Sequence, residues 1–281
     1  MAGMEMTPDA MGGLPTFHSR VDNWECDFNG HWNTRFYTRA FQLASELVAS
    51  LEDGVNPGAA AIRSRHMRFH SELFPGDPVE IRSAALSGGD YDGAVVHLLL
   101  SGGKLSATAL DRPGRGAEHL PVLSAQSLPF ALPRGLDGVS SHGRDSGEGA
   151  ILIETGAIRP AELDHTGALL FDEIIRRCAF GSHALVVGLG YSPAFTERTG
   201  IGRMLAEMHV ELLGRADQGS ALQVTSRLTA AGGKSFRTTH HLHARDGRSI
   251  AFIDLCTLAV DMKSRRATDV PDFLLANVQP S

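Results

Sequence analysis

The chain has 281 residues, of which 42% are hydrophobic and 21% charged, and its formal net charge at pH 7 is −6. This composition is typical of a globular protein, is long enough for two domains, and excludes a disordered or fibrous chain. We expect no nucleic-acid partner, because phosphate binding needs clustered Lys and Arg side chains that this sequence lacks.

Membrane and export signals are also missing from the sequence pattern. No apolar run reaches about 18 residues, so no membrane span is expected. Residues 1–15 lack a basic start followed by an apolar run, which predicts a polar tail rather than a signal peptide. The three cysteines (Cys26, Cys178 and Cys256) are odd in number and far apart, which argues against a disulfide framework. We therefore expect a cytoplasmic protein.

The first half of the chain predicts one helix followed by a β-meander. Residues 16–24 alternate as a short strand. Apolar residues from Phe36 to Leu51 recur at helical spacing, which predicts an amphipathic helix at about 31–51 with Asn29 as a candidate cap. Proline and glycine turn signals then separate four predicted strands, at 60–71, 79–86, 94–100 and 104–110. This order predicts an antiparallel sheet wrapped on one helix.

The segment 112–149 has a different character, with four prolines and seven glycines, and predicts a linker or crossover. The earlier pattern then restarts. Residues 162–167 align without gaps on residues 25–30, at an offset of 137. A second helix is predicted at about 168–180, and four further strands at 205–213, 221–229, 235–244 and 249–260. Repetition at so long a period indicates a duplicated domain rather than a solenoid.

A dense polar motif stands where the first predicted helix begins. It reads Asp27-Phe28-Asn29-Gly30-His31-Trp32-Asn33, with Tyr37 about one turn further on. This order resembles the D-x-x-G-H-x-N-x-x-x-Y signature of the hot-dog-fold thioesterases, closest to their 4-hydroxybenzoyl-CoA and acyl-CoA or acyl-ACP branch. The resemblance implies an α+β chain of two tandem hot-dog domains, each a long helix wrapped by an antiparallel sheet. The domains are expected at 14–111 and 150–265, joined by the crossover at 112–149.

The resemblance also carries expectations about assembly and substrate. Single hot-dog domains pair as dimers, so a tandem chain is expected to form a pseudo-dimer within itself, with the active site at that interface. Further homo-oligomers remain open. The expected substrate is an acyl-CoA or an acyl-carrier protein, with no separate cofactor, because CoA or phosphopantetheine is part of the substrate.

Asp27 is the principal candidate catalytic residue. A carboxylate just before a helix can act as nucleophile or as general base toward water. The N–H groups and dipole of the helix N-terminus can stabilise the oxyanion that forms on a thioester. The alternative is that Asp27 only caps the helix, which is common for aspartate there.

Two roles are considered for each of the other motif residues. In the resembling enzymes the histidine or asparagine orients water or polarises the thioester carbonyl, which implies this role for His31, Asn33 or Asn29. Capping or packing is the alternative for His31 and Asn33. Tyr37 is expected along an acyl tunnel or in the core.

The second copy departs from the motif. Asp164 and Gly167 remain, but Ala168 and Leu170 stand where His31 and Asn33 would be, and neither side chain donates or accepts a hydrogen bond. We therefore expect one competent site. Acids of the second copy remain candidates because some hot-dog enzymes carry the acid on the helix; they are Asp164, Glu162, Asp172 and Glu173.

Two further clusters have chemical readings. Arg63, Arg65 and Arg68 can bind a CoA or phosphopantetheine phosphate, or can simply be solvated surface. In the run His240-His241-x-His243, only His241 and His243 share a strand face, and no cysteine or carboxylate lies at ligand spacing, so no metal site is expected.

Three functions follow from these features. The leading hypothesis is a metal-independent acyl-thioester hydrolase, for which the absence of a G-x-S-x-G motif excludes the α/β-hydrolase route. The alternatives are a hot-dog hydratase or dehydratase acting on an acyl thioester, and a non-catalytic protein that binds acyl thioesters.

Overall fold

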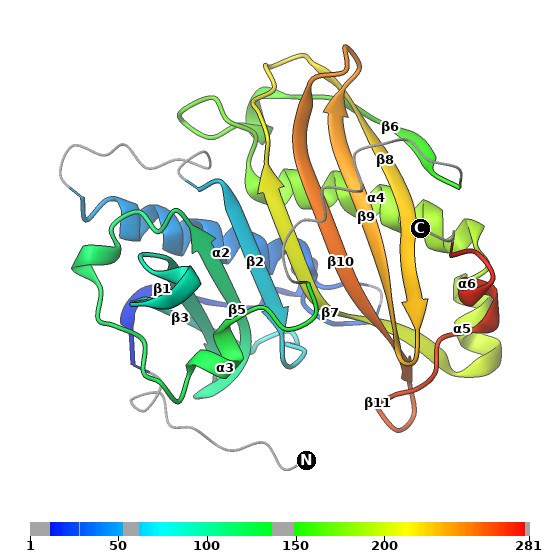
Figure 1. The fold of residues 1–281 in the computed structure, drawn as a ribbon, viewed down its shortest axis with the longest axis horizontal. Helices are drawn as coiled ribbons and strands as arrows, with labels where there is room; N and C mark the ends of the chain where they lie inside the picture. The colour runs from blue at the N-terminus through cyan, green and yellow to red at the C-terminus, as the bar shows by residue number, and fades with distance from the viewer. Residues whose placement is uncertain (1–11, 28, 53–61, 137–148, 279–281) are drawn as a thin grey trace. The chain divides into compact units, whose positions relative to one another are not determined.

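The computed structural model describes residues 12–27, 29–52, 62–136 and 149–278 (Figure 1). The chain divides into two compact units. Unit 1 comprises residues 1–133 and 164–172, and unit 2 comprises residues 134–163 and 173–281. This division into compact units does not test the domain boundaries expected from the sequence, which remain a prediction.

Unit 1 is an antiparallel sheet with one long helix. Its elements are β1 (Leu14–Arg20), α2 (Thr34–Ala49), β2 (Ser64–Phe69), β3 (Pro78–Ala85), β4 (Val95–Ser101) and β5 (Lys104–Arg112). The strands lie in the order β1-β3-β4-β5-β2, and each neighbouring pair is antiparallel. Helix α2 packs on β1, β3, β4 and β5 through an apolar face centred on Phe41 and Ala44, which are fully buried. The alternation and helical spacing of the sequence account for both elements.

Unit 2 repeats the same connections. Its elements are β6 (Ile151–Ala157), α4 (Phe171–Gly188), β7 (Ile201–Leu212), β8 (Ala221–Gly232), β9 (Ser235–Ala244) and β10 (Ser249–Asp261), with the first two residues of α4 grouped in unit 1. The strands lie in the order β6-β8-β9-β10-β7, and a short β11 (Arg266–Ala267) pairs with β10. This is the strand order of unit 1 with β6 in the place of β1. The predicted α+β duplication is confirmed.

Several boundaries differ from expectation. Helix α2 begins at Thr34, not near His31, because the side chain of Asn33 accepts a hydrogen bond from the Arg35 N–H (3.0 Å) and so caps the helix. Helix α4 continues to Gly188, beyond the predicted end. Strand β6 and the helices α5 (Pro193–Thr199) and α6 (Asp272–Leu275) were not predicted.

The first part of the predicted crossover packs on the sheet of unit 1. Helix α3 (Leu128–Ala131) and residue Leu123 pack against apolar residues of β3, β4 and β5. Arg68 donates from Nη1 to the carbonyls of Pro129 (2.7 Å) and Leu132 (3.0 Å) and so anchors α3 to β2. Residues 137–148 lie outside the described residues.

A row of polar side chains crosses the unit 1 sheet, one from each strand. It runs through Thr16, Ser83, His97, Asp111 and Arg65. The successive contacts are 2.7 Å between the two hydroxyls, 2.6 Å from Ser83 Oγ to His97 Nδ1, and 3.2 Å from His97 Nε2 to Asp111 Oδ2. Arg65 closes the row with two hydrogen bonds of 2.6 Å to the Asp111 carboxylate. These five buried polar groups thus form one connected hydrogen-bond network across the sheet.

The Arg65–Asp111 pair also fastens helix α2. Both side chains are 1% exposed. Ser45 of α2 donates to Asp111 Oδ2 (2.8 Å), and Arg65 Nη2 donates to the Phe41 carbonyl (3.4 Å). Burial alone would raise the pKa of Asp111, but the Arg65 guanidinium and the hydrogen bonds from Arg65 and His97 hold this pKa well below its ordinary value. The carboxylate is therefore an anion matched to one buried cation.

Replacing Asp111 with asparagine should destabilise the protein strongly. The variant leaves the Arg65 guanidinium buried without its counter-charge, which costs about 3–5 kcal/mol. Urea unfolding of wild type and Asp111→Asn measures the loss. Arg248→Ala is the control, because its ion pairs lie at the surface, and its unfolding midpoint should match wild type. A loss below about 1 kcal/mol in Asp111→Asn would contradict this role for the pair.

Candidate active site

The loop that carries the motif is closed by Asp27. Its Oδ1 accepts hydrogen bonds from the backbone N–H groups of Asn29 (2.8 Å) and His31 (3.2 Å). Its own N–H donates to the His31 carbonyl (2.8 Å), and its carbonyl accepts from Gly30 (3.0 Å). Gly30 has a φ of +77°, a conformation that favours glycine. Asp27 therefore holds the loop, whereas Asn33 caps the helix. Phe28 lies outside the described residues.

A second segment is joined to this loop. The Trp32 N–H donates to the Leu73 carbonyl (2.8 Å), which ties the motif to the connection between β2 and β3. This hydrogen bond sets Glu72 beside the imidazole of His31, with 3.2 Å from His31 Nδ1 to Glu72 Oε1. The His31 side chain is 13% exposed and that of Glu72 is 27% exposed, so the pair is sheltered but reachable.

Glu72 is the residue that sequence reasoning missed. Nothing in the motif points to it, because it lies 41 positions after His31 in a connection between strands. The only available signal was an acidic residue just after the first strand of the meander. The imidazole of His31, paired with Glu72 and close to the Asp27 carboxylate, can take up and return a proton. General acid–base catalysis requires a group that does this.

Two predicted residues have structural roles here. Asn33 is exposed, and its side-chain oxygen is used as the cap of α2. Tyr37 is 4% exposed and packs against Trp32 and Phe69, with ring centroids 4.3 and 5.6 Å away. Burial raises the pKa of the Tyr37 phenol, which keeps it neutral. The Trp32 indole N–H donates to Glu25 Oε2 (2.8 Å) and fixes the ring under the loop.

The loop at Asp164 repeats the Asp27 loop bond by bond. Asp164 Oδ1 accepts from the N–H groups of Thr166 (2.8 Å) and Ala168 (2.9 Å), and the Asp164 N–H donates to the Ala168 carbonyl (2.8 Å). Gly167 has the same φ of +77° as Gly30. The aspartate common to both copies thus closes a loop. What differs is the side chains around it: Thr166, Ala168 and Leu170 stand where the first copy has Asn29, His31 and Asn33.

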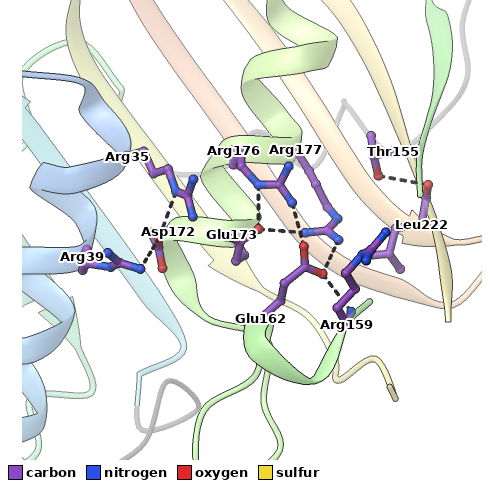
Figure 2. A network of polar contacts seen from close by, with 10 residues as sticks. All are labelled: Arg35, Arg39, Thr155, Arg159, Glu162, Asp172, Glu173, Arg176, Arg177 and Leu222. Atoms are coloured by element: carbon purple, nitrogen blue, oxygen red, sulfur yellow. Dashed lines mark hydrogen bonds and ion pairs between the residues drawn. The ribbon is translucent and has the colours of Figure 1, made fainter. Parts of the chain in front are cut away.

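The remaining candidate acids are paired with arginines, as Figure 2 shows. Within unit 1, Asp172 is 1% exposed and lies 3.0 Å from Arg35 Nε and 3.5 Å from Arg39 Nη2. A cavity of about 260 Å³ lies beside Asp164 and Asp172, lined mainly by apolar surface that includes Leu43 and Leu170. The Asp172 carboxylate is thus paired with two guanidinium groups.

Within unit 2, two acids share two guanidinium groups (Figure 2). Glu162 accepts from Arg176 Nη2 and from Arg177 Nη2, both at 2.8 Å. Glu173 accepts from Arg176 Nε (2.7 Å) and Arg177 Nη1 (3.2 Å). Arg177 is 1% exposed, so these pairs belong to the packing of α4 rather than to an open site.

The family model of the thioesterase-like superfamily matches residues 21–114 and 158–278. The chain belongs to this superfamily. Thioester hydrolysis is therefore the class of reaction to which it is assigned. The two matched segments correspond to the two copies of the fold, one around α2 and one around α4.

Solved thioesterases share the fold of this superfamily member. An acyl-ACP thioesterase from Bacteroides thetaiotaomicron VPI-5482 has a TM-score of 0.57 at 10% identity, over 90% of this chain and 100% of its own. The 12:0-ACP thioesterase from Umbellularia californica has a TM-score of 0.56 at 12% identity, over 86% of this chain and 93% of its own. No curated protein sequence matches this chain. Among the described residues, no helix is long and apolar enough to cross a membrane.

The three arginines expected at a CoA phosphate have different surroundings. Arg65 was expected at the surface, but it is 1% exposed and paired with Asp111, so it is closed to a phosphate. Arg68 uses Nη1 to hold the carbonyls of α3. Arg63 is exposed and remains a candidate. The alternation of a strand predicts which residues share a face but not which face is covered.

The histidine run of β9 is satisfied within the sheet. His240 is fully buried, with Nδ1 2.8 Å from Ser226 Oγ and Nε2 3.0 Å from Thr238 Oγ1. The rings of His241 and His243 lie 5.0 Å apart, consistent with a shared face. Among the described residues, no group of three or more His, Cys, Asp or Glu side chains is arranged to hold a metal ion.

His240 should make stability fall as the pH is lowered. Burial lowers the pKa of His240 from its ordinary 6.5 to about 3. The unfolded chain therefore takes up a proton below about pH 6.5 that the native state refuses, so stability is lost between about pH 6.5 and 3. Unfolding midpoints between pH 7 and pH 4 should fall less steeply in His240→Gln than in wild type. The exposed His119→Gln should keep the wild-type slope, and equal slopes in all three proteins would contradict the assignment.

Proposed function

We propose that this chain hydrolyses acyl thioesters of CoA or of acyl-carrier protein at a site formed by Asp27, Asn29, His31 and Glu72. The observation that carries the proposal is the His31–Glu72 pair, at 3.2 Å, beside the loop that Asp27 closes. Membership of the thioesterase-like superfamily supports the reaction class. The names of the similar structures, both acyl-ACP thioesterases, support the substrate class.

His31 serves as the general base in this scheme. It takes a proton from water as the water oxygen attacks the thioester carbonyl carbon, and Glu72 orients the ring and stabilises the imidazolium. The carbon–sulfur bond then breaks, and the proton passes to the departing sulfur. The products are a carboxylic acid and a free thiol. No metal or additional cofactor takes part.

Asp27 and Asn29 position the reacting groups. Asp27 Oδ1 accepts the two backbone hydrogen bonds of its loop. Its Oδ2 receives no hydrogen bond from the part of the chain that the structure describes. That oxygen accepts a hydrogen bond from the attacking water, or attacks the carbonyl itself as a nucleophile. The side-chain amide of Asn29 is exposed and supplies N–H donors for the carbonyl oxygen.

Asp27→Asn should abolish most thiol release without opening the loop. Asparagine keeps an oxygen that accepts from the N–H groups of Asn29 and His31, whereas alanine would remove it and perturb the loop. We expect kcat on acyl-CoA substrates to fall by roughly 10²–10³-fold, measured as free thiol released from octanoyl-, dodecanoyl- and benzoyl-CoA.

The matched control is Asp164→Asn, the same change in the twin loop. It should keep the wild-type kcat within about twofold while shifting the unfolding midpoint as much as Asp27→Asn does. Full activity in Asp27→Asn would show that the charge of this carboxylate is not needed.

Glu72→Gln tests the residue that the sequence did not reveal. The amide keeps the shape of the side chain but no longer stabilises a positive imidazole. We therefore expect kcat to fall by roughly 10–10²-fold with KM nearly unchanged. Steady-state thiol release from the same acyl-CoA substrates measures both constants, and circular dichroism checks that the fold is intact. A raised KM with wild-type kcat would instead assign Glu72 to substrate binding.

The same measurements separate the other two functions. Hydration of an enoyl-CoA without thiol release would establish a hydratase. Binding of an acyl-CoA without turnover of any kind would establish a silent acyl-thioester-binding protein. Either result would overturn the hydrolase proposal.

A further inference from the structure

One large apolar side chain stands exposed at the edge of the His31–Glu72 pair. Phe74 is 47% exposed, and its ring meets that of His31 edge-on, with centroids 5.2 Å apart and planes at 84°. Single exposed apolar residues are common and need no explanation by themselves. The position of Phe74, two residues after Glu72 and against His31, is what distinguishes it.

The turn that carries Phe74 is held rigidly. It reads Phe74-Pro75-Gly76-Asp77, and Gly76 has a φ of +90°, the pattern of a type II turn. The Phe74 N–H donates to Asp77 Oδ2 (2.8 Å), and the Asp77 N–H donates back to the Phe74 carbonyl (3.0 Å). Gly76 and Asp77 also exchange hydrogen bonds with Val21, both at 2.9 Å, just before the motif loop. The backbone that carries the ring is therefore held in one conformation before a substrate binds, which lowers the entropic cost of a contact there.

The direction of exposure decides which part of the substrate meets this ring. A thioester bound at His31 has an acyl group on one side of the sulfur and a pantetheine arm on the other. The arm ends in a charged nucleotide or in a carrier protein, and neither can be buried, so the arm must leave toward solvent. Phe74 is much more exposed than the His31 side chain, at 47% against 13%, so its ring is accessible to a group that lies between His31 and solvent.

We propose that Phe74 is a substrate-contact residue that packs against the pantetheine arm next to the thioester sulfur. This inference rests on the proposed function of the same site. It makes Phe74 a determinant of recognition for the arm that CoA and carrier-protein substrates share, and not for the acyl group.

The test compares two substrates that differ only in the arm. One is whichever of octanoyl-, dodecanoyl- or benzoyl-CoA the wild type cleaves fastest, and the other is the S-ethyl thioester of the same acid, which has no pantetheine. For Phe74→Ala, KM for the acyl-CoA should rise about five- to tenfold with kcat unchanged, as expected for losing part of one aromatic contact. The value of kcat/KM for the S-ethyl thioester should stay within about twofold of wild type.

Two variants serve as controls. Phe74→Leu keeps an apolar side chain on the same turn and should recover most of the affinity. Val122→Ala removes another exposed apolar side chain, which is 63% exposed. The Val122 backbone forms a β-bridge with Ala85, at the end of β3 that is farther from the Phe74 turn. This variant should leave both substrates unaffected.

Equal losses with both substrates would overturn the proposal, because they would place Phe74 at the acyl group or in the integrity of the loop. Unchanged KM for the acyl-CoA would overturn it as well. Titration of free CoA gives an independent readout, and Phe74→Ala should weaken CoA binding by the same factor. Loss of CoA affinity in a chain that releases no thiol would uphold the arm contact while refuting hydrolysis. Normal hydrolysis by the wild type, together with a CoA affinity that Phe74→Ala does not change, would uphold hydrolysis while refuting the arm contact.

Discussion

The hydrogen bonds that one aspartate makes to its own loop are the constraint on which the candidate site depends. Asp27 accepts from the backbone two and four residues ahead, and Gly30 supplies the left-handed turn that lets the chain come back to it. In the closed loop, the N–H of Trp32 donates to the carbonyl of Leu73. Because Glu72 precedes Leu73, this hydrogen bond places Glu72 beside His31. The Asp164 loop keeps the same bonds but has alanine in place of the imidazole, so the scaffold and the chemistry are separable.

Two buried carboxylates differ in their partners from the carboxylates of the candidate site: the former are paired with arginines, and the latter with backbone N–H groups or an imidazole. Asp111 and Asp172 are both 1% exposed, and each carboxylate is paired with a guanidinium group. Asp27 instead faces backbone N–H groups, and Glu72 faces an imidazole. An imidazole releases and takes up protons near neutral pH, whereas a guanidinium does not. This difference in partner is why we propose the Asp27 region, and not the arginine-paired acids, as the site of proton transfer.

Much of the fold followed from patterns along the chain. The offset of 137 between the two aspartate loops is a repeat that an ungapped comparison of the two halves reveals. The apolar stripe of α2 and the alternating strands of the meander are local periodicities, and both were found where expected. The start of α2 was placed too early, because Asn29, His31 and Asn33 all lie within reach of a helix start and only the backbone geometry shows that Asn33 is the cap. Strand β6 was missed because its sequence, ILIETGA, does not alternate between apolar and polar residues, and none of its residues is buried.

The sequence by itself determined the duplicated helix-and-sheet architecture and the aspartate, asparagine and histidine of the motif, because these depend on residues within one turn or one strand of each other. The tertiary structure alone decided that Glu72 lies beside the His31 imidazole, that Arg65 is buried against Asp111, and that Phe74 contacts the His31 ring. Those contacts join residues up to 46 positions apart and depend on how strands pair and loops close. Local propensity carries no information about such pairings, because the same residue types would suit a solvated surface equally well.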